Sequence, residues 1–393
     1  MEGLKEENLK ETRPKAKINE DRIWLSPPHM GGEEKALITE AIDSNWVAPG
    51  GPFLRKFEKV LSNFVQCQSS LALSSGTAAL HLALRLLGIR QGDEVICSSF
   101  TFTASANPIL YQGATPVFID SELETWNMCP NALEQAVQSR IVNGKKPKAI
   151  ILVHLYGMPA KLGEIIDISK KYKIPLIEDA AEALGSNYKG KALGTFGQMG
   201  IYSFNGNKII TTSGGGALVS ENPDLIKKAL FFATQAKDGA PHYEHSQLGY
   251  NYRMSNVCAA IGVAQMKVLS ERIRRRREIY AYYEKHLSVI KGIEFLPEPK
   301  GFYSNRWLSC ILIHPEYIKG VNREQLRLRL LRHNIESRLL WKPLHLQPLY
   351  RNFPYFGNKF SERLFERGLC LPSGSALTKD QLDFIIGIIK ESF

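Results

Sequence analysis

Short runs of apolar residues recur through the first half of the chain, and segments with the helical spacing of apolar positions separate them. The runs are SLALS (70–74), EVICS (94–98), TPVFI (115–119), AIILV (149–153), PLIED (175–179) and MGIYS (199–203). Strands that are apolar on both faces and alternate with helices are typical of a parallel sheet covered on both sides. The pattern predicts a large α/β unit with a mostly parallel sheet over residues 23–265.

The pattern changes after residue 265. A long helix carrying an arginine run (272–277) leads to an alternating strand at 307–313, a helix around 323–332 and a strand at 335–341. Thr378 and Gln381 fit a capping box that opens a C-terminal helix. We therefore expect a smaller α+β unit over residues 266–393. Residues 1–22 are polar, and we expect them to form a flexible tail.

The amino-acid composition favours a folded protein without membrane spans. Of the 393 residues, 44% are hydrophobic and 23% are charged, which suits a chain that buries a large core and excludes disorder as its main state. No window reaches 18 uninterrupted apolar residues, so we expect no membrane span. The charged N-terminus does not resemble a signal peptide. Six scattered cysteines favour free thiols in a cytoplasmic protein.

The net charge of +11 is compatible with nucleic acid, with an anionic small substrate or with solubility alone. The arginine run at 272–277 lacks interleaved aromatic residues, and we interpret it as a solvated helix face. We expect no nucleic-acid partner. His242 and His245 have no further ligands at metal spacing, so no metal site is expected. His154, Tyr202 and Trp307 are interpreted as core residues.

Four features of the large unit point to one kind of chemistry. Gly76 and Thr77 lie between a strand and a helix, where backbone N–H groups and hydroxyls can bind a phosphate; alone, this turn also fits an ordinary N-cap. Asp179 ends an apolar strand and is suited to a buried cation, although it also fits an N-cap.

Lys208 precedes a glycine run and is suited to forming a Schiff base, although a lone lysine is usually a surface residue. Phe102 follows a strand and is placed to stack on a flat ring or to join the core. A phosphate site, a ring platform, a partner for a pyridine nitrogen and a Schiff-base lysine are together what pyridoxal phosphate requires.

These motifs occur in an order that resembles the DegT/DnrJ/EryC1/StrS family of sugar-nucleotide aminotransferases. The resemblance covers about residues 23–393 and includes SSGTAALHLAL, GDEVICSSFTFTASANPI, HLYGMPA, IEDAAEALGS, YSFNGNKIITTSGGGAL and GYNYRMSNVCAAIGVAQM. It implies an α/β aspartate-aminotransferase-like fold of type I, pyridoxal 5'-phosphate as cofactor, and active sites shared across a homodimer.

The resemblance also implies residue roles. Lys208 matches the Schiff-base lysine, Asp179 the partner of the pyridine nitrogen, and Phe102 the stacking aromatic. Gly76, Thr77 and Ser203 match phosphate contacts, and Asn251 matches an asparagine that reaches the phosphate from the partner subunit. Glu182 stands near the cofactor's phenolic oxygen, where many relatives have Gln or His, which leaves its protonation state open.

The segments SNWVAPGGP and IESRLLWKPLHLQPLY resemble the bacillosamine-type subgroup. That resemblance implies transfer of an amino group from L-glutamate, which leaves 2-oxoglutarate, to UDP-4-keto-6-deoxy-N-acetylglucosamine. Trp46 is either a wall of the sugar site or an anchor of its own segment, Arg253 is suited to the diphosphate, and His345 resembles a substrate-side residue. The alternatives are a 3-keto or a dTDP- or GDP-linked sugar, a dehydratase, which Lys208 disfavours, and a non-catalytic cofactor-binding regulator.

Overall fold

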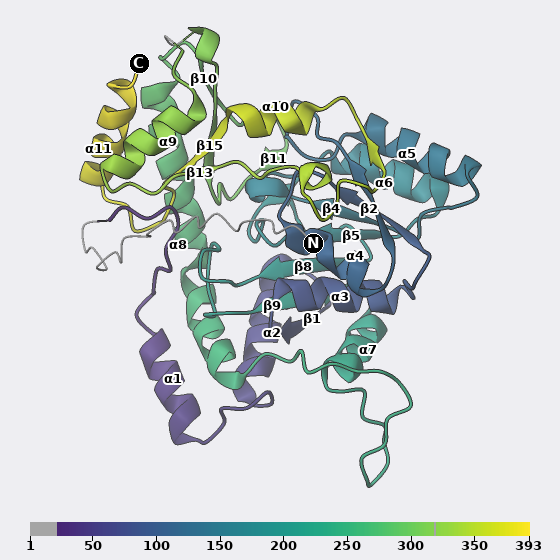
Figure 1. Cartoon of the computed structure of the whole chain (residues 1–393). Helices are drawn as coiled ribbons and strands as arrows, with labels where there is room; N and C mark the ends of the chain where they lie inside the picture. Colours follow the sequence, from purple (N-terminus) through teal and green to yellow (C-terminus); the bar gives the residue numbers. More distant parts are fainter. Residues whose placement is uncertain (1–21, 318–319) are drawn as a thin grey trace, which may run out of the picture.

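The structure is a computed structural model that describes residues 22–317 and 320–393 (Figure 1). A sheet of eight strands in the order β1-β9-β8-β5-β4-β2-β3-β14 forms the centre of its larger part. The strands are β1 (Ser69–Leu73), β2 (Glu94–Ser98), β3 (Thr115–Ile119), β4 (Ala149–Val153), β5 (Leu176–Asp179), β8 (Met199–Ser203), β9 (Gly216–Ser220) and β14 (Tyr355–Phe356). All six apolar runs therefore form strands of one sheet.

One strand of this sheet runs against the others. β9 pairs antiparallel with both β1 and β8, whereas β8, β5, β4, β2, β3 and β14 pair in parallel. A parallel connection needs a crossover, usually a helix, and the segment 204–215 between β8 and β9 contains no α-helix. The chain therefore turns back directly, and Lys208 lies in the returning loop.

Helices cover both faces of the sheet (Figure 1). On β4, Ile150 and Leu152 join the core on one face, and Ala149 and Ile151 join the core on the other, as the alternation of side chains in a strand requires. The first core includes residues of α2 (Pro52–Val65), α5 (Pro130–Val142), α6 (Leu162–Tyr172) and α8 (Asn256–Leu287). The second includes residues of α3 (Gly76–Leu86), α4 (Asn107–Tyr111) and α7 (Pro223–Ala233). α1 (Glu34–Asp43) packs against α8.

The C-terminal part has its own sheet and core. Its four antiparallel strands are β10 (Ile293–Phe295), β12 (Ser309–Ile313), β15 (Gly368–Leu371) and β13 (Arg338–Leu339). Its helices are α9 (Arg323–Arg332), α10 (Phe360–Arg367) and α11 (Lys379–Lys390), and Thr378 and Gln381 form the predicted capping box. β11 (Phe302–Tyr303), β6 (Asn187–Tyr188) and β7 (Lys191–Ala192) form a separate small sheet.

The helix α8 links the two parts. Its residues up to Ile273 pack in the core of the large sheet, and its residues from Ile279 onward pack in the C-terminal core. The boundary expected after residue 265 therefore falls inside one continuous helix. Ile23 also packs in the C-terminal core and bridges to Ile335, whereas residues 1–21 of the expected tail lie outside the described residues.

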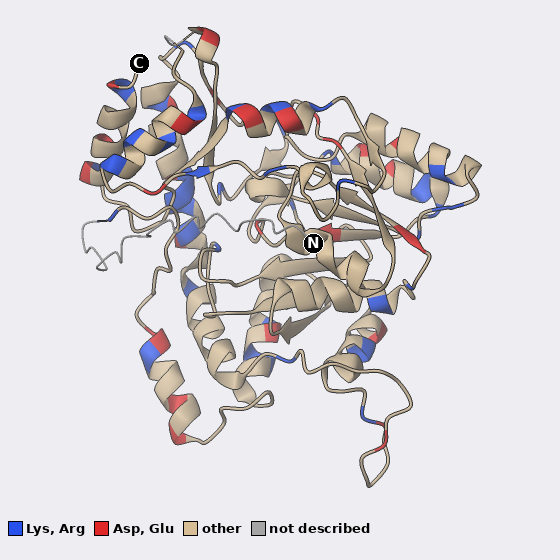
Figure 2. Ribbon diagram, in the orientation of Figure 1, with Lys and Arg blue, Asp and Glu red and all other residues tan. Residues whose placement is uncertain are grey.

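The arginine run on α8 is not simply a solvated face, as the sequence analysis expected. Basic residues colour the middle of α8 in Figure 2. Arg274 is exposed beside Glu278, but Arg272 and Arg276 are buried. Arg272 and Arg276 are four positions apart and therefore lie on the same face of α8. They are buried because this stretch of α8 passes between the two parts of the protein, which cover that face.

Among the described residues, no helix has both the length and the apolar character that crossing a membrane requires. Over the same ranges, no group of three or more His, Cys, Asp or Glu side chains is placed to hold a metal ion. His154 is buried, with its Nε2 atom 2.9 Å from an oxygen of Glu178, and is the core histidine that was predicted.

Candidate active site

A cavity of about 500 Å³ opens where β1, β4, β5 and β8 reach their carboxyl ends. This edge is where parallel sheets place their ligand-binding groups. Seven residues that the sequence analysis selected line it: Gly76, Thr77, Phe102, Asp179, Glu182, Ser203 and Lys208. The topology therefore brings together residues that are up to 132 positions apart in the sequence (76 to 208).

The amine of Lys208 lies between an acid and an aromatic ring. Its Nζ atom is 3.5 Å from Oε1 of Glu182 and 4.2 Å from the centre of the Trp307 ring. Only 13% of the Lys208 side chain is exposed. The β8–β9 loop thus directs a largely buried amine into the cavity, in the setting that a nucleophilic lysine needs.

Glu182 is buried behind Lys208. Its Oε2 atom accepts a hydrogen bond of 2.7 Å from the backbone N–H of Tyr156. Burial raises the pKa of the Glu182 carboxyl, and the nearby charge of Lys208 acts in the opposite direction. This acid therefore holds a proton at a higher pH than an exposed glutamate does. Its carboxyl also lies close enough to the amine of Lys208 to accept a hydrogen bond from it.

Asp179 ends β5 and is almost completely buried. Its Oδ2 atom accepts a 2.7 Å hydrogen bond from the hydroxyl of Ser105, and its Oδ1 atom accepts one of 3.2 Å from the N–H of Ala181. It has no ion pair with any described residue. A buried carboxylate without a cation is costly, so this site is suited to a ligand that carries a positive charge at that point.

The other end of the cavity is suited to an anion. Gly76 and Thr77 begin α3, and the Ser75 hydroxyl caps the helix by accepting a 3.0 Å hydrogen bond from the N–H of Ala78. Helix N-termini attract anions because their first N–H groups have no partner within the helix. A side chain at Gly76 would lie 3.3 Å from Cβ of Ser203, so a glycine keeps this approach open. The residues present fit a cofactor with a phosphate at one end and a protonated ring nitrogen at the other.

Three aromatic residues, Phe102, Trp307 and Trp341, line the cavity, and the buried Tyr156 packs against the two tryptophans. The ring of Phe102, which is half exposed, lies 5.2 Å from that of Trp341, and the Tyr156 ring stacks at 6.3 Å on Trp307 and at 6.4 Å on Trp341. Tyr202 is a core residue, as predicted. Trp307 is buried as predicted, but it also lines the cavity, which corrects its interpretation as core only.

Four further candidates do not line this cavity within the chain. Asn251 is exposed, and Trp46 is 52% exposed in the segment between α1 and α2. The guanidinium of Arg253 is paired with Glu58 and donates a 2.8 Å hydrogen bond to the carbonyl of Ala72, so it braces β1.

The fourth of these candidates, His345, is held inside the fold. Its ring stacks at 3.8 Å on Tyr355, and its two nitrogens lie 2.6 Å from the Ser99 hydroxyl and 3.3 Å from Glu362. Burial lowers the pKa of His345, although Glu362 opposes that effect. The substrate roles that were expected for Trp46, Arg253 and His345, and the phosphate contact that was expected for Asn251, remain proposals.

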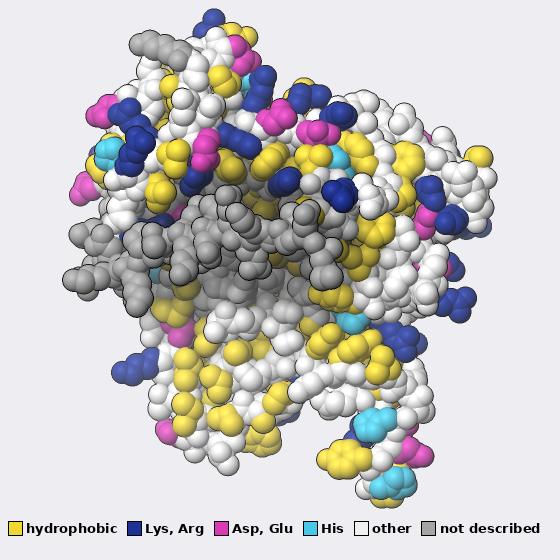
Figure 3. Space-filling model, viewed as in Figure 1, with side chains coloured by type: hydrophobic (Ala, Val, Ile, Leu, Met, Phe, Trp, Pro, Cys, Tyr) yellow, Lys and Arg dark blue, Asp and Glu magenta, His cyan; other side chains and the backbone are white. Residues whose placement is uncertain are grey.

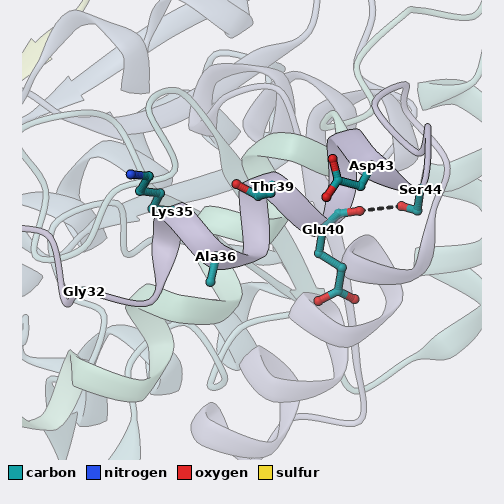
Figure 4. Close-up of a pocket in the computed structure, with 7 residues that line it drawn as sticks. All are labelled: Gly32, Lys35, Ala36, Thr39, Glu40, Asp43 and Ser44. Carbon is teal, nitrogen blue, oxygen red and sulfur yellow. Dashed lines mark hydrogen bonds between the residues drawn. The ribbon is translucent and has the colours of Figure 1, made fainter.

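A second hollow lies along α1 and is lined by Gly32, Lys35, Ala36, Thr39, Glu40, Asp43 and Ser44 (Figure 4). The Ser44 hydroxyl there donates a 2.7 Å hydrogen bond to the Glu40 carbonyl. The hollow is larger, at about 850 Å³, but it is an open surface beside one helix. It has neither a buried unpaired carboxylate nor a buried amine, so we assign the chemistry to the cavity around Lys208.

Several residues of the cavity were not predicted from the sequence, among them Arg338, Trp341 and Ser105. Arg338 and Trp341 belong to the segment 335–341, which was predicted as a strand and whose only functional signal was its resemblance to a subgroup. Ser105 was part of a motif that was chosen for Phe102. No spacing rule places any of them beside Lys208, because their contacts depend on the tertiary fold.

Comparison with known proteins agrees with this geometry. The model of the DegT/DnrJ/EryC1/StrS aminotransferase family matches residues 28–390. EpsN of Bacillus subtilis (strain 168), whose name describes a pyridoxal phosphate-dependent aminotransferase, is 50% identical over 376 residues, which are 95% of this chain and 96% of EpsN. GDP-perosamine synthase of Escherichia coli O157:H7 is 40% identical, and the match covers 94% of this chain and 98% of that protein.

A solved structure shows the same fold. The crystal structure of a DegT DnrJ EryC1 StrS aminotransferase from Brucella abortus superimposes with a TM-score of 0.86 at 30% identity, covering 91% of this chain and 95% of that one. The α/β fold of type I and the cofactor pyridoxal phosphate, both implied by the resemblance, are thereby confirmed. The chain is a sugar aminotransferase and belongs to the DegT/DnrJ/EryC1/StrS aminotransferase family.

Proposed function

We propose that this enzyme moves an amino group from L-glutamate to the 4-keto carbon of a UDP-linked 6-deoxy-N-acetylhexosamine. The observation that carries the reaction is that one cavity holds the buried amine of Lys208, the unpaired carboxylate of Asp179 and the N-terminus of α3. The choice of sugar and nucleotide rests on the resemblance of residues 44–52 and 335–350 to the bacillosamine-type enzymes.

Each residue of the cavity has a separate role in the proposed reaction. When bound, pyridoxal phosphate supplies an electron sink for the carbon that loses its proton. Lys208 is the covalent attachment point and then the base that moves that proton. Asp179 would keep the ring nitrogen protonated, and the first N–H groups of α3 would hold the phosphate. Glu182, whose Oε1 atom lies 3.5 Å from the amine of Lys208, would orient that amine, and the family resemblance assigns it to the phenolic oxygen of the cofactor.

A substrate panel tests the assignment. The purified enzyme is incubated with glutamate and with 4-keto-6-deoxy sugars linked to UDP, GDP or dTDP, and the aminated products are measured by mass spectrometry. We expect the highest kcat/KM with the UDP-linked N-acetyl sugar. Preference for the GDP-linked sugar would support the second candidate, which the 40% identity to GDP-perosamine synthase favours. No amination of any keto sugar would contradict both.

Arg338 is suited to the carboxylate of the donor. It lines the same cavity as Lys208, and its NH2 atom lies 2.7 Å from Glu336, whose other oxygen accepts a 2.9 Å hydrogen bond from the N–H of Leu25. Nε and NH2 of Arg338 both donate to Oε1 of Glu336, so the carboxylate of the donor would bind the outward N–H groups of NH1 and NH2, which form a parallel pair. We therefore assign glutamate recognition to Arg338.

Arg338→Met is expected to lower kcat/KM for glutamate by about tenfold to hundredfold, the usual effect of losing hydrogen bonds to a charged group. The amination of the keto sugar by enzyme that already carries the amino group should change less. Rapid-mixing measurement of each half-reaction checks this, with the exposed Arg351→Met as the matched control. Equal losses in both half-reactions would place Arg338 in support of the cofactor instead.

We propose that the enzyme is a homodimer whose active sites are shared. Asn251 is exposed in this chain and lies outside the cavity, as a residue that serves the neighbouring subunit would. The segment between α7 and α8 projects from the body of the chain (Figure 1), and its exposed residues include Tyr243 and Leu248.

Apolar surface elsewhere supports the same proposal. Figure 3 shows hydrophobic side chains gathered on the lower part of one face, and the exposed hydrophobic residues of α1 and the following segment include Ile42, Trp46 and Val47. Contiguous exposed apolar surface is typical of interaction sites. We propose that a second copy of this chain covers this surface.

Complementation tests the sharing of sites. Lys208→Ala and Asn251→Ala subunits, each inactive alone, are mixed and allowed to exchange. If half of the dimers become hybrids with one intact site, activity should return to about a quarter of the wild-type value. Mock mixtures of each variant with itself are the controls. Proven subunit exchange without recovery would place Asn251 in its own subunit's site.

A further inference from the structure

Arg276 is a buried cation without an anionic partner. Its side chain is 1% exposed, and among the described residues no carboxylate lies within ion-pair distance of it. It donates hydrogen bonds to the carbonyl oxygen of Trp307 and, at 2.9 Å, to the hydroxyl of Ser26. Burial, with a smaller effect from Arg272, lowers the pKa of Arg276 to about 9. Burying a guanidinium without a carboxylate partner is unfavourable, so the burial of Arg276 at this place needs an explanation.

The two residues that Arg276 contacts, Ser26 and Trp307, both contact the residue next to Lys208. The Ser26 hydroxyl donates a 2.8 Å hydrogen bond to the backbone carbonyl of Asn207, the residue before Lys208. The indole N–H of Trp307 donates a second one, also of 2.8 Å, to the same carbonyl. The Trp307 ring is the one that lies 4.2 Å from the amine of Lys208.

We infer that Arg276 is a positioning residue that, through Ser26 and Trp307, fixes the loop and the ring that aim the amine of Lys208. The inference rests on the proposed role of Lys208 as the attachment point. It joins four segments that are far apart in the sequence: α8, the segment around Ser26 before α1, the β8–β9 loop, and the segment with Trp307 before β12.

The neighbouring arginines show that this role is particular to Arg276. Arg272, one turn earlier and also buried, donates to the carbonyl of Met30 at 3.1 Å. Arg274 is exposed and pairs with Glu278. Neither of them donates a hydrogen bond to Ser26 or Trp307, the two contacts of Arg276. A guanidinium suits the position because its fixed geometry sends separate donors to two acceptors, whereas a lysine ammonium offers one centre.

The test compares Arg276→Met, Arg276→Lys and Ser26→Ala with the control Arg274→Met, all as holoenzymes. We expect kcat to fall about tenfold or more in the first three, with KM for either substrate nearly unchanged, because a small misplacement of a reacting group is costly. Arg274→Met should behave as wild type. The double variant Arg276→Lys/Ser26→Ala should lose less than the product of the two single losses, because both act through one carbonyl.

A spectroscopic measurement separates positioning from mere bracing. The absorption band of the cofactor bound to Lys208 is titrated with pH. A loosened Trp307 ring stabilises a positive charge on the Lys208 nitrogen less well, so the midpoint should fall by roughly half a pH unit. A lower melting temperature with unchanged kcat and an unchanged midpoint would overturn the inference. If Arg276→Met does not fold, Ser26→Ala decides, since it removes a single hydroxyl.

A further experiment tests the proposed role of Lys208 independently of the role of Arg276. Borohydride reduction of the wild-type holoenzyme, followed by peptide mapping, should place the cofactor on Lys208. Labelling elsewhere would refute the proposed role of Lys208. Labelling on Lys208 together with normal kcat and a normal midpoint in the Arg276 and Ser26 variants would refute only the positioning role.

Discussion

Lys208→Ala is expected to lower turnover by about 10⁴-fold or more, because the variant loses both the covalent attachment point and the base that moves the proton. The fold should survive. Lys208 lies in the loop between β8 and β9, and its contacts are those of a site, a 3.5 Å approach to Glu182 and the face of Trp307. Circular dichroism and the melting temperature check that the variant is folded.

Lys208→Arg is the matched control. It retains a positive charge beside Glu182, so that carboxyl keeps a cationic neighbour, but a guanidinium remains protonated at neutral pH and is a poor nucleophile. We expect it to be as inactive as Lys208→Ala and to lack the absorption band of lysine-bound cofactor. Substantial activity in either variant, measured with glutamate and the keto sugar, would show that another group performs this chemistry.

The sequence predicts the large sheet well because its signal is local. Strands such as β4 are apolar on both faces, and the residues that follow strands meet at one edge of a parallel sheet. That rule is sufficient to bring Asp179, Lys208 and the start of α3 into one cavity. It does not depend on knowing how the C-terminal part packs.

What the sequence could not give depends on contacts between distant segments. Trp341 and Arg338 come from the C-terminal part, more than 120 residues after Lys208, and no periodicity links them to it. The burial of Arg276 was missed for the same reason, since a run of arginines looks solvated until its helix is packed between two cores. Arg253 illustrates the converse, because only 11% of its side chain is exposed and Glu58 and the Ala72 carbonyl occupy it, whereas 57% of the Arg338 side chain is exposed.

Asp179→Asn should preserve the shape of the site and remove its charge. The amide is nearly the same size as the carboxylate, and its oxygen can still accept the 2.7 Å hydrogen bond that the Ser105 hydroxyl now donates to Oδ2. What is lost is the negative charge that keeps the ring nitrogen of the cofactor protonated. Without that proton the ring withdraws electrons poorly, so proton removal from the donor slows by about two to three orders of magnitude, the range seen when a fixed electrostatic contact is lost.

The measurement is the rate of the glutamate half-reaction, followed by the loss of the band of lysine-bound cofactor. Ser105→Ala is the matched control, because it removes the hydrogen bond but keeps the charge, and its loss should be much smaller. The substitution of glutamate's α-hydrogen by deuterium should slow Asp179→Asn more than wild type, since proton transfer then limits the rate. Wild-type rates in Asp179→Asn would show that the ring nitrogen needs no anion here. A loss of rate in Ser105→Ala as large as that in Asp179→Asn would show that the reaction requires the hydrogen bond and not the charge.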